Sequence, residues 1–409
     1  MMGKSKIRFK GYNEDWEQRK LGDIITEYKE TVDSDCTLPI LTSSKTEGVI
    51  LQEEHFGRKQ QHDITGYNIL PRNYCTYRNR SDGVDFTFNI NKCCDKGIIS
   101  KFYPVFSGKH SDVFFLSLVL NNSEEVVREI AYTCTGTGQK VLSFLDLQKM
   151  KVRVPNFDEQ KEIAAYFESL DHLITLHQHK CDEMKKLKKC MLQKMFPQNG
   201  KKVPEIRFEG FTNDWEQRKF GELAEYKKGP FGSAITKSMF VPKSDDSVKV
   251  YEQQNAINKD WSLERYFLPK EYAYTRLKAF EVHSGDIIVS CAGTIGEIYE
   301  IPDNAEYGVI NQALMRVRVN EKIVDKRMFI IAFSNMINEF TRTHSNGSAI
   351  KNIPPFADLK PMKVLMPSME EQRVISEYFE KIDNLITLHQ HKCDELQNLK
   401  KYMLQNMFV

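Results

Sequence analysis

The chain has 409 residues, of which 41% are hydrophobic and 28% are charged, and this composition is typical of a folded globular protein. At about 150 residues per domain, the length predicts two or three domains. Lysine and arginine number 58 against 56 aspartates and glutamates, so the net charge indicates no class of partner and any basic surface must be local. These values exclude a wholly disordered, collagen-like or low-complexity chain.

No apolar run in the sequence is long enough to cross a membrane. The longest, around residues 113–120, is interrupted by Ser117, whereas a membrane span requires about 20 residues. The amino-terminal residues lead into polar sequence without the apolar centre of a signal peptide. The nine cysteines form no Cys-x-x-Cys pair and indicate reduced thiols. We therefore expect a soluble, cytoplasmic, multidomain protein that does not associate with a membrane.

Two stretches of the sequence occur twice. The segment 7–20 returns at 206–219, an offset of 199 positions, and the segment 159–196 returns at 371–408, an offset of 212 positions. In the second pair, 26 of 38 aligned residues are identical. The intervening segments, roughly 24–150 and 223–360, show almost no similarity to each other. Each half of the chain is thus a shared leading segment, a private middle and a shared tail.

Each tail is expected to form one long amphipathic helix, because apolar residues recur at steps of four and three without an intervening Gly or Pro. At about 1.5 Å per residue, each helix would be roughly 57 Å long. A helix of this length must bury its seam, and the best partner is its own near-copy in an antiparallel pair; docking on another subunit is the alternative. The predicted seam contains Ile163, Phe167, Leu170, Ile174, His177, Cys181, Met184, Met191 and Met195, repeated as Ile375, Phe379, Ile382, Ile386, His389, Cys393, Leu396, Met403 and Met407.

The private middles have the composition of mixed α/β domains. Strands are expected within 85–90, 97–106, 284–290 and 308–319, and helices near 123–134 and 325–342. The predicted fold class is α+β, with two globular α/β domains separated by two long helices that form an antiparallel coiled coil with a pseudo-twofold internal repeat. The expected division is a first globular domain at 1–155, a first helix at 156–197, a linker at 198–205, a second globular domain at 206–367 and a second helix at 368–409.

Three short motifs follow one another in the same order in both halves. They are Trp-Glu-Gln-Arg-Lys-Leu-Gly-Asp at 16–23 and Trp-Glu-Gln-Arg-Lys-Phe-Gly-Glu at 215–222, Gly-Thr-Gly-Gln-Lys at 136–140 and Gly-Ser-Ala-Ile-Lys at 347–351, and Glu-Gln-Lys-Glu-Ile from 159 and Glu-Gln-Arg-Val-Ile from 371. With the two diverged middles and two near-identical tails, this order resembles the specificity subunit of type I restriction–modification enzymes. The resemblance covers essentially the whole chain.

The resemblance implies that each globular domain is a target-recognition domain that reads one half of a bipartite double-stranded DNA sequence. It implies that the helices separate these domains and hold two methyltransferase (modification) subunits, with restriction subunits added outside. It also implies a chain without catalytic activity that binds no cofactor itself, since S-adenosylmethionine, ATP and Mg²⁺ are expected on the partner subunits.

The sequence itself shows no convincing catalytic motif. The prolines at 354 and 355 invite comparison with the loop of amino-methyltransferases, but Asn352 lies one position too early to present its amide to a target amine. The glycines at 136 and 138 lack both the third glycine of a dinucleotide turn and the Gly-Lys-Ser/Thr ending of a phosphate loop. Two alternatives stay open, namely a repressor-like DNA-binding module with a coiled-coil spacer and an enzyme with an unrecognised site.

The strongest candidate for DNA contact in the first middle is the locally basic stretch 58–80. It interleaves aromatic residues with Arg and Asn, whose side chains suit phosphates and base edges, although an ordinary exposed strand would have a similar composition. In this middle we expect DNA contacts from Arg58, Lys59, Arg72, Tyr77, Arg78, Asn79, Arg80, Lys101, Tyr103 and Lys140.

In the second middle, a basic turn at 226–233 carries glycines that would let the backbone approach a phosphate closely. Two amide-rich stretches offer side chains able to pair with adenine. Loop polarity without DNA contact is the alternative for each of these segments. The residues expected to contact DNA here are Lys227, Lys228, Ser233, Gln253, Gln254, Asn255, Asn311, Gln312 and Lys351.

His177 and Cys181, repeated as His389 and Cys393, all lie on the predicted seam. Two His and two Cys are a possible tetrahedral zinc set. The favoured interpretation is that the polar histidines set the register of the helix pair and the cysteines fill small apolar spaces. We therefore expect no bound metal.

Overall fold

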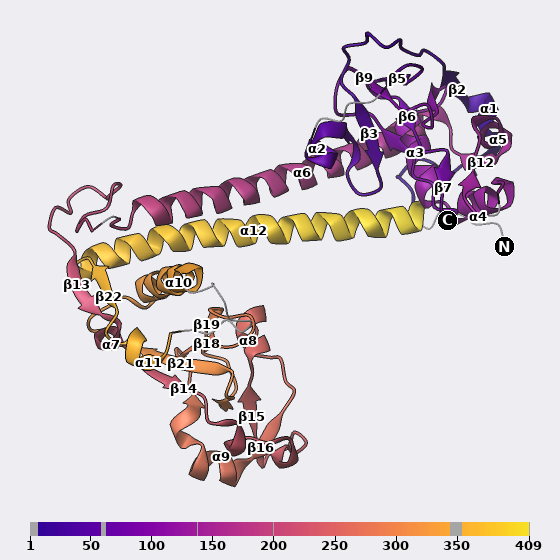
Figure 1. Ribbon diagram of the computed structural model, residues 1–409. Coiled ribbons are helices and arrows are strands. Elements are labelled where there is room, and N and C mark those ends of the chain that lie inside the picture. The colour runs from indigo at the N-terminus through magenta and orange to yellow at the C-terminus, as the bar shows by residue number, and fades with distance from the viewer. Residues whose placement is uncertain (1–6, 59–62, 137, 199, 344–353, 409) are drawn as a thin grey trace. The chain divides into compact units, whose positions relative to one another are not determined.

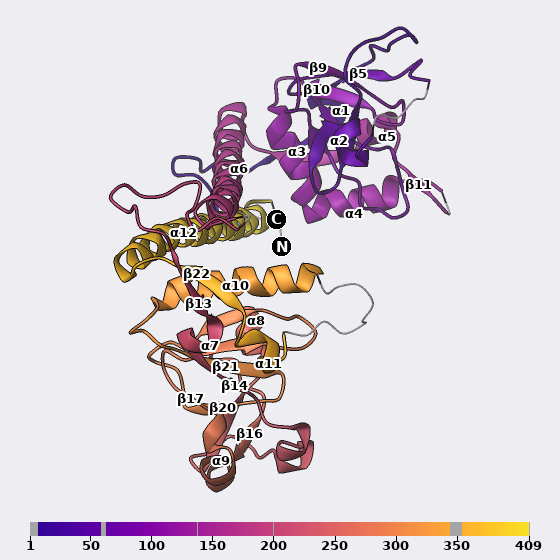
Figure 2. The same cartoon turned by 60° about the vertical axis from the view of Figure 1, so that its left-hand side comes forward.

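The computed structural model describes residues 7–58, 63–136, 138–198, 200–343 and 354–408. The chain divides into two compact units, Met1–Cys181 with Thr387–Val409, and Asp182–Ile386. Each unit contains one globular domain and a part of both long helices (Figures 1 and 2). The boundary between the units therefore falls near the middle of each helix, whereas the sequence predicted helices that are segments separate from the globular domains.

The two expected long helices are present as α6 (Phe157–Lys194) and α12 (Met369–Met407). The predicted seam is confirmed, because Ile163, Phe167 and Ile174 of α6 are buried in the core of the first unit, together with Cys393 and Leu396 of α12. In the second unit the remaining parts of the helices share a core through the seam residues Ile375, Phe379, Ile382 and Met195.

Within each unit the two helix segments pair antiparallel, and the same ion pair fixes each pairing. In the first unit the Lys400 ammonium donates to Asp171 at 2.5 Å. In the second unit Lys188 donates to Asp383 at 2.6 Å. Asp171 and Asp383 are equivalent positions of the repeat, as are Lys188 and Lys400, so the two lysines that interrupt the predicted seam have matching partners.

His177 lies against His389 in the first unit, with 3.0 Å between their Nδ1 atoms. A residue therefore contacts its own repeat equivalent, which defines the helix register that the sequence left open. Among the residues that the structure describes, no three His, Cys, Asp or Glu side chains lie close enough to hold one metal ion. The geometry thus brings two imidazoles together, not the four ligands that the zinc alternative requires.

The two ends of each private middle are joined by a short antiparallel strand pair. Strand β1 (Glu17–Lys20) pairs with β12 (Lys151–Val154), and β13 (Glu216–Lys219) pairs in the same way with β22 (Lys363–Met366). The chain therefore leaves the shared scaffold after β1 or β13 and returns to it beside the same strand, directly before a long helix.

A buried ion pair ties each leading segment to the start of its helix. The Arg8 guanidinium binds Glu159 through two contacts of 2.7 and 2.8 Å, and Glu159 is fully buried. Arg207 binds Glu371 in the same bidentate way at 2.8 Å, and the Glu371 side chain is 1% exposed. Bidentate arginine–carboxylate geometry is among the stronger polar contacts in proteins.

The globular part of the first unit contains a sheet with strand order β2-β10-β6-β8, all antiparallel, and the smaller pairs β3·β4, β5·β9 and β7·β11. Buried α3 packs beside this sheet in the main core, and Asp112 caps it by accepting the Phe115 N–H at 2.8 Å. The elements are α1 (Leu21–Ile24), β2 (Ile25–Tyr28), β3 (Leu41–Ser44), β4 (Gly48–Leu51), α2 (Gln52–Phe56), β5 (Asn68–Pro71), β6 (Cys75–Thr76), β7 (Arg80–Ser81), β8 (Asn89–Ile90), β9 (Lys96–Ile99), β10 (Val105–Gly108), α3 (Val113–Asn122), α4 (Glu124–Thr133), β11 (Lys140–Val141) and α5 (Phe144–Lys149).

The globular part of the second unit has two sheets, with strand orders β14-β21-β18-β19 and β16-β15-β20-β17. All of their pairings are antiparallel except β15 with β20. The elements are α7 (Phe220–Leu223), β14 (Ala224–Lys228), β15 (Ser247–Tyr251), α8 (Gln253–Asn258), β16 (Phe267–Pro269), α9 (Lys270–Arg276), β17 (Glu281–Val282), β18 (Ile287–Ser290), β19 (Ile298–Glu300), β20 (Gly308–Ile310), β21 (Leu314–Val319), α10 (Lys326–Thr343), α11 (Phe356–Leu359) and the 3₁₀ turns Gly232–Ala234, Lys237–Met239 and Lys278–Phe280.

The expected helices near 123–134 and 325–342 are confirmed as α4 and α10. The strand expected over 97–106 is two strands, β9 and β10, because a turn closed by the Tyr103 N–H donating to the Ser100 carbonyl separates them. Likewise, 308–319 contains two strands, β20 and β21, and only 89–90 of the expected strand at 85–90 is present. No helix within the described ranges has the length and apolar character needed to cross a bilayer.

The Arg207→Ala substitution should destabilise the second unit. It leaves the buried Glu371 carboxylate without its counter-ion, and such a loss typically costs about 3–5 kcal/mol. The matched control is Arg218→Ala, which removes an exposed pair with Glu216 and should cost less than about 1 kcal/mol. Thermal unfolding followed by circular dichroism measures both, and equal shifts in Tm would contradict a structural role for the buried pair.

The stability of the helix pair should depend on pH through His177. Burial lowers the pKa of this imidazole, and nearby His389, Lys180 and Lys392 lower it further. The unfolded chain therefore takes up the proton at a higher pH than the folded chain, so this contribution is present above about pH 6.5 and is lost as the pH falls below that value.

Replacing both histidines, in the His177→Leu/His389→Leu variant, should flatten the change in Tm between about pH 7.5 and 5.5. The control is His179→Ala/His391→Ala, whose side chains are exposed on the same helices and which should keep the wild-type pH dependence. The same pH dependence in both variants would exclude the His177–His389 contact as its source.

Candidate nucleic-acid interface

The structure brings three segments of the first globular domain together, and each was predicted to contact DNA. The Asn79 N–H donates to the Phe102 carbonyl at 2.9 Å, and the Leu142 N–H donates to the Asn79 carbonyl at 3.0 Å. Strand β7 also pairs with β11, which sets Arg80 opposite Val141. As a result Arg78, Arg80, Lys101, Tyr103 and Lys140 belong to one local assembly, which we call the first basic surface.

A hollow of about 630 Å³ lies at this surface and is lined by Ser43, Lys45, Arg78, Arg80, Ser81, Asp82, Gly83, Val84, Asp85, Phe86, Thr87 and Tyr103. Lys45 pairs with Asp85, and this hydrogen bond, with a further one from Ser81, lowers the pKa of the Asp85 carboxyl. The charges of Lys45 and Asp85 therefore offset each other. Arg78 is exposed and has no ion pair with any residue that the structure describes, so it contributes an uncompensated positive charge.

Arg80 is held over the ring of Phe102, with 4.5 Å from its guanidinium carbon to the ring centroid, and the Lys101 ammonium lies 5.9 Å from the same ring. The Phe102 side chain is 38% exposed. The residues on both sides of Phe102, Lys101 and Tyr103, were predicted to contact DNA, but Phe102 itself was not. The signal that could have identified it is an aromatic residue directly after a lysine.

The other residues predicted in the first domain are buried, bound within the protein or outside the first basic surface. Tyr77 is fully buried and its hydroxyl donates to the Leu142 carbonyl at 3.1 Å, so the prediction of a DNA contact from this side chain is wrong. Arg72 is bound to Asp95 and to the Lys92 carbonyl. The Asn79 Oδ1 is buried and accepts no hydrogen bond within the described part of the chain. Arg58 is exposed after α2, and Lys59 lies outside the described residues.

In the second domain, the turn after β14 is pressed against the turn between β20 and β21. The Gly229 N–H donates to the Leu314 carbonyl at 2.8 Å, and a Cβ at this glycine would lie 1.8 Å from the Asn311 carbonyl oxygen. A Cβ at Gly232 would lie 2.5 Å from the Gln312 side-chain oxygen. The close approach therefore requires glycine at 229, whereas at 232 the flexible Gln312 side chain could move aside. It gathers Lys227, Lys228, Ser233, Asn311 and Gln312 into what we call the second basic surface.

The second basic surface presents polar and aromatic groups to solvent. Lys228, Ser233 and Gln312 are exposed, whereas Lys227 lies over the Phe280 ring at 4.9 Å. Phe231, which was not among the predicted DNA contacts, is 89% exposed next to buried Pro230. The Asn311 Oδ1 accepts the Ala313 N–H, so it is already used within its own turn.

The other amides of the second domain are occupied to different degrees. Asn255 is buried, and its Nδ2 donates to the carbonyls of Asp260 and Leu263 at 3.0 and 2.9 Å, so the prediction that it contacts DNA is wrong. Gln253 donates to the Thr294 carbonyl, and Gln254 is exposed beside Asn258. Lys351 lies outside the described residues.

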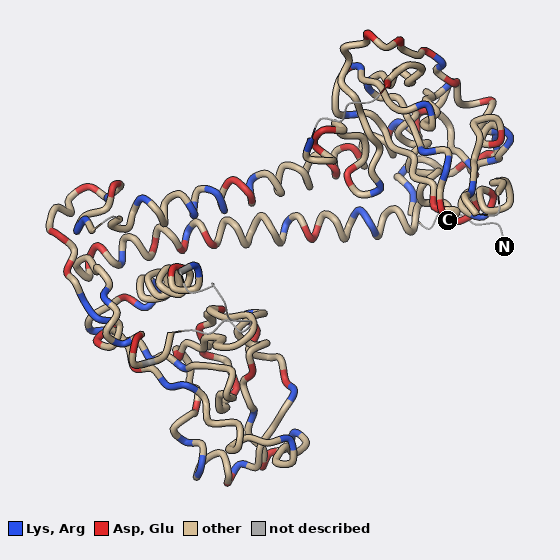
Figure 3. The backbone as a smooth tube through the Cα atoms, in the orientation of Figure 1, with Lys and Arg blue, Asp and Glu red and all other residues tan. Residues whose placement is uncertain are grey.

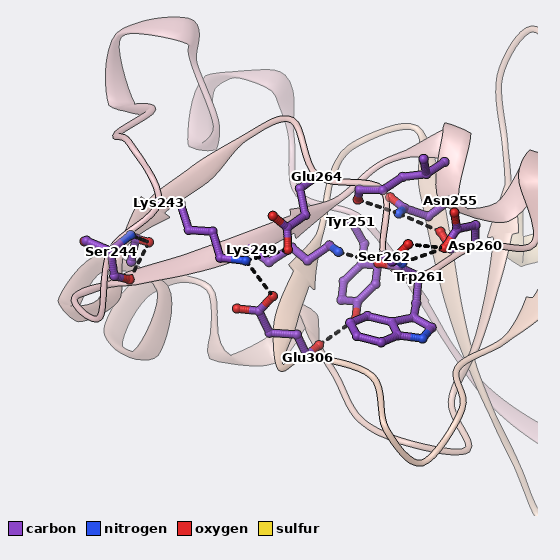
Figure 4. Close-up of polar contacts among 12 residues, drawn as sticks. Lys243, Ser244, Lys249, Tyr251, Asn255, Asp260, Trp261, Ser262, Glu264 and Glu306 are labelled. Atoms are coloured by element: carbon purple, nitrogen blue, oxygen red, sulfur yellow. Dashed lines mark hydrogen bonds and ion pairs between the residues drawn. The ribbon is translucent and has the colours of Figure 1, made fainter.

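Asn255 belongs to a buried polar network around Lys249 of β15 (Figure 4). The Lys249 ammonium donates to the Trp261 carbonyl and lies over the rings of Tyr251 and Trp261 at 5.2 and 5.4 Å. Burial lowers the pKa of Lys249. The nearby carboxylates of Glu264 and Glu306 contact Lys243 at 2.7 and 3.8 Å.

Charged residues in this network are therefore bound to neighbours within the protein. Lys249 and Asn255 hold the backbone of the 260–263 segment, and both glutamates face Lys243. These contacts hold the loop at 260–263 in place. They give no support to the alternative of an enzyme with an unrecognised active site.

Lysines are numerous in the second half of α6, but acidic residues are interleaved with the basic ones along both long helices (Figure 3). Lys188 and Lys194 are paired with Asp383 and Glu205, and Lys202 lies 3.8 Å from Asp214. The pairing favours a solvated helix face over a continuous basic track for DNA.

The sequence profile of one protein family, described as the type I restriction modification DNA specificity domain, matches residues 13–186 and 212–398. Two relatives come from Methanocaldococcus jannaschii. The putative type I restriction enzyme MjaX specificity subunit is 23% identical over 269 residues, and the type I restriction enzyme MjaVIII specificity subunit is 24% identical over 281 residues. The alignments cover 65% and 66% of this chain and 60% and 64% of the two relatives, so the chain spans less than two thirds of their length.

Solved structures show the same fold. The type I restriction–modification S subunit from M. genitalium aligns with a TM-score of 0.59 and 13% identity, over 98% of both chains. A chain from a structural study of complex assembly and conformational transition in the type I R-M system aligns with a TM-score of 0.53 and 14% identity, over 96% of this chain and 97% of that one. Since the profile matches both halves, each with its private middle and much of its long helix, the chain belongs to the family of type I restriction–modification DNA specificity proteins.

Proposed function

We propose that this chain is the DNA-recognition subunit of a type I restriction–modification complex, and that each globular domain reads one half of a bipartite double-stranded target. The observation that carries the proposal is the contrast, in each unit, between a scaffold that is repeated and an insert whose sequence is not. The strand pair, the buried ion pair and the helix pairing are repeated with equivalent residues. The inserts between them share almost no sequence, although their main sheets, β2-β10-β6-β8 and β14-β21-β18-β19, have the same order of strands. The repeated scaffold suits a task that is the same in both halves, such as binding two identical partners. The two different inserts suit two tasks that differ, such as reading two different DNA half-sites.

The first and second basic surfaces support DNA as the ligand. Each combines exposed cationic side chains with hydrogen-bonding groups, the first around Arg78 and Arg80 and the second around Lys228 and Gln312. Cations position a protein on phosphates, and amides and guanidinium groups can read base edges. The DNA contacts that we propose from the remaining accessible residues are those of Arg58, Lys101, Tyr103, Lys140, Lys227, Ser233, Gln253 and Gln254.

The partners that we propose are two methyltransferase subunits, held by the long helices, and restriction subunits added outside them. The supporting feature is a stretch that is identical in both helices, 173–183 and 385–395. Leu173 and Leu176 are each 37% exposed, and their equivalents Leu385 and Leu388 are 42% and 61% exposed. Packing within the chain does not account for these outward-facing leucines, and two identical partners would explain why both copies keep them.

The proposed chain is not itself a catalyst and works in the cytoplasm, with S-adenosylmethionine, ATP and Mg²⁺ bound by the partner subunits. The absence of catalytic motifs from the sequence and the saturated polar network around Lys249 are consistent with this division of labour.

Exchanging residues 21–150 for the corresponding domain of another specificity protein should change one half of the recognised DNA sequence and leave the other half intact. The exchange starts after β1 and ends before β12, so it keeps the strand pair that closes the insert. Methylome sequencing of strains carrying the exchanged and original chains measures the outcome, and the exchange of 220–362 is the reciprocal control. A change in both halves from either single exchange would contradict the modular assignment.

The outward-facing leucines should determine how many methyltransferase subunits bind. Leu388→Glu should reduce the stoichiometry from two to one, and Leu176→Glu/Leu388→Glu should abolish binding, because an unpaired charge in an apolar contact is strongly unfavourable. Leu145→Glu is a matched control at an exposed leucine of α5, outside the repeat, and should retain both partners. Native mass spectrometry counts the subunits, and two bound partners in the double variant would remove this face from the interface.

A further inference from the structure

We propose that Arg80 reads a guanine in the major groove of the half-site bound by the first domain, and that Phe102 is the positioning residue that holds its guanidinium in the required plane. This inference rests on the proposed function and makes it specific, since it assigns one side chain to one kind of base.

Backbone hydrogen bonds bring the Arg80 and Phe102 side chains together. The Asn79 N–H donates to the Phe102 carbonyl at 2.9 Å, and the next residue, Arg80, opens a strand that pairs with β11. The guanidinium carbon then lies 4.5 Å from the centroid of the Phe102 ring. A guanidinium that stacks on an aromatic ring has one face covered and keeps its edge, which carries the N–H donors, free.

The donors of Arg80 are not used inside the protein. Its side chain has no hydrogen bond or ion pair with any residue within the described ranges, and it is exposed at the edge of the hollow described above. Three other arginines of the first unit differ, since Arg8 is bound to Glu159, Arg72 to Asp95 and Arg153 to Glu125. Arg78 is also without an ion pair in the described part of the chain, but it makes no cation–π contact there. Arg80 is therefore held against the Phe102 ring while its hydrogen-bonding capacity remains available.

This combination fits a base better than a phosphate. Two parallel N–H donors match the O6 and N7 acceptors of guanine, which face the major groove and are distinct from the pattern of any other base pair. A phosphate can be contacted from many directions by either arginine or lysine, whereas the two guanine acceptors lie in the plane of the base and require donors in that same plane. Arg78 and Lys101, which lack a comparable stacking distance, are suited to phosphates.

The test uses the full chain in complex with its modification subunits and the duplex target found by methylome sequencing. Each guanine of the first half-site is replaced singly by 7-deazaguanine, which lacks the N7 acceptor. The measured quantity is the ratio of affinities for the natural and substituted duplexes at several salt concentrations. The wild-type complex should lose roughly 10- to 100-fold at one guanine.

Arg80→Lys keeps the charge and loses the planar fork, so it should abolish discrimination at that guanine while the salt dependence of binding stays unchanged. Phe102→Leu should reduce discrimination at the same position, and Phe102→Tyr should restore it. Lys101→Met, beside the same ring, is the matched control and should reduce the salt dependence without affecting any single base. The Tm of each variant, measured by circular dichroism, confirms folding.

Three results would overturn the inference: a first half-site without guanine, equal weakening of all duplexes by Arg80→Lys, or full discrimination in Phe102→Leu. Each leaves the proposed function intact. If the wild-type complex binds equally well after the whole first half-site is scrambled, the proposed function itself fails, and this outcome is recognised before any variant is made.

Discussion

The requirement that each inserted domain begin and end at the same place underlies the rest of the structure. The pairing of β1 with β12 and of β13 with β22 holds the two ends of each inserted domain together. The buried carboxylates of Glu159 and Glu371 bind the leading segments to the long helices. A buried carboxylate is unfavourable unless its partner is present. The arginine of each leading segment must therefore lie beside this carboxylate. Its position in turn determines where the following strand, β1 or β13, begins.

This closure allows one scaffold to carry two unrelated surfaces. Within the first insert, the basic surface is built where β7 meets β11 and the 101–103 turn. Within the second, it is built where two turns approach so closely that Gly229 has no room for a side chain. Neither construction involves the scaffold strands, so each surface can change without a change in the residues that hold the domain.

The helices and their seam were predictable because a 3.5-residue spacing is a local property of the sequence, and both copies of the repeat supply it independently. The register was not, because it depends on contacts such as His177 with His389 that join positions 212 residues apart. The strands at 97–106 were misjudged for a different reason. Composition shows that residues suit a strand, but the turn at 100–103 depends on backbone hydrogen bonds that composition does not contain.

The candidate DNA residues divide in the same way. A basic aromatic stretch identifies Arg78 and Arg80, but it does not show which side chains point into the core. Tyr77, the residue directly before Arg78, is wholly buried. The prediction for Asn255 was wrong for a similar reason, because its amide donates hydrogen bonds to two carbonyls that follow it in the chain. The stacking of Arg80 on Phe102 unites residues 22 positions apart, and only the folded structure reveals it.

The strand pair that closes each insert also has a consequence for chain entropy. The two inserts differ by a net 13 residues, since the leading segments repeat at 199 positions and the helices at 212. For a chain segment whose ends are already held together, the free energy of closure rises only with the logarithm of its length, by about 0.6 kcal/mol for each doubling. A difference of 13 residues in inserts of this size therefore has almost no effect on closure. The length of an insert can therefore change at almost no cost in closure free energy. The property that must be kept is the distance between the first and last residues of the insert.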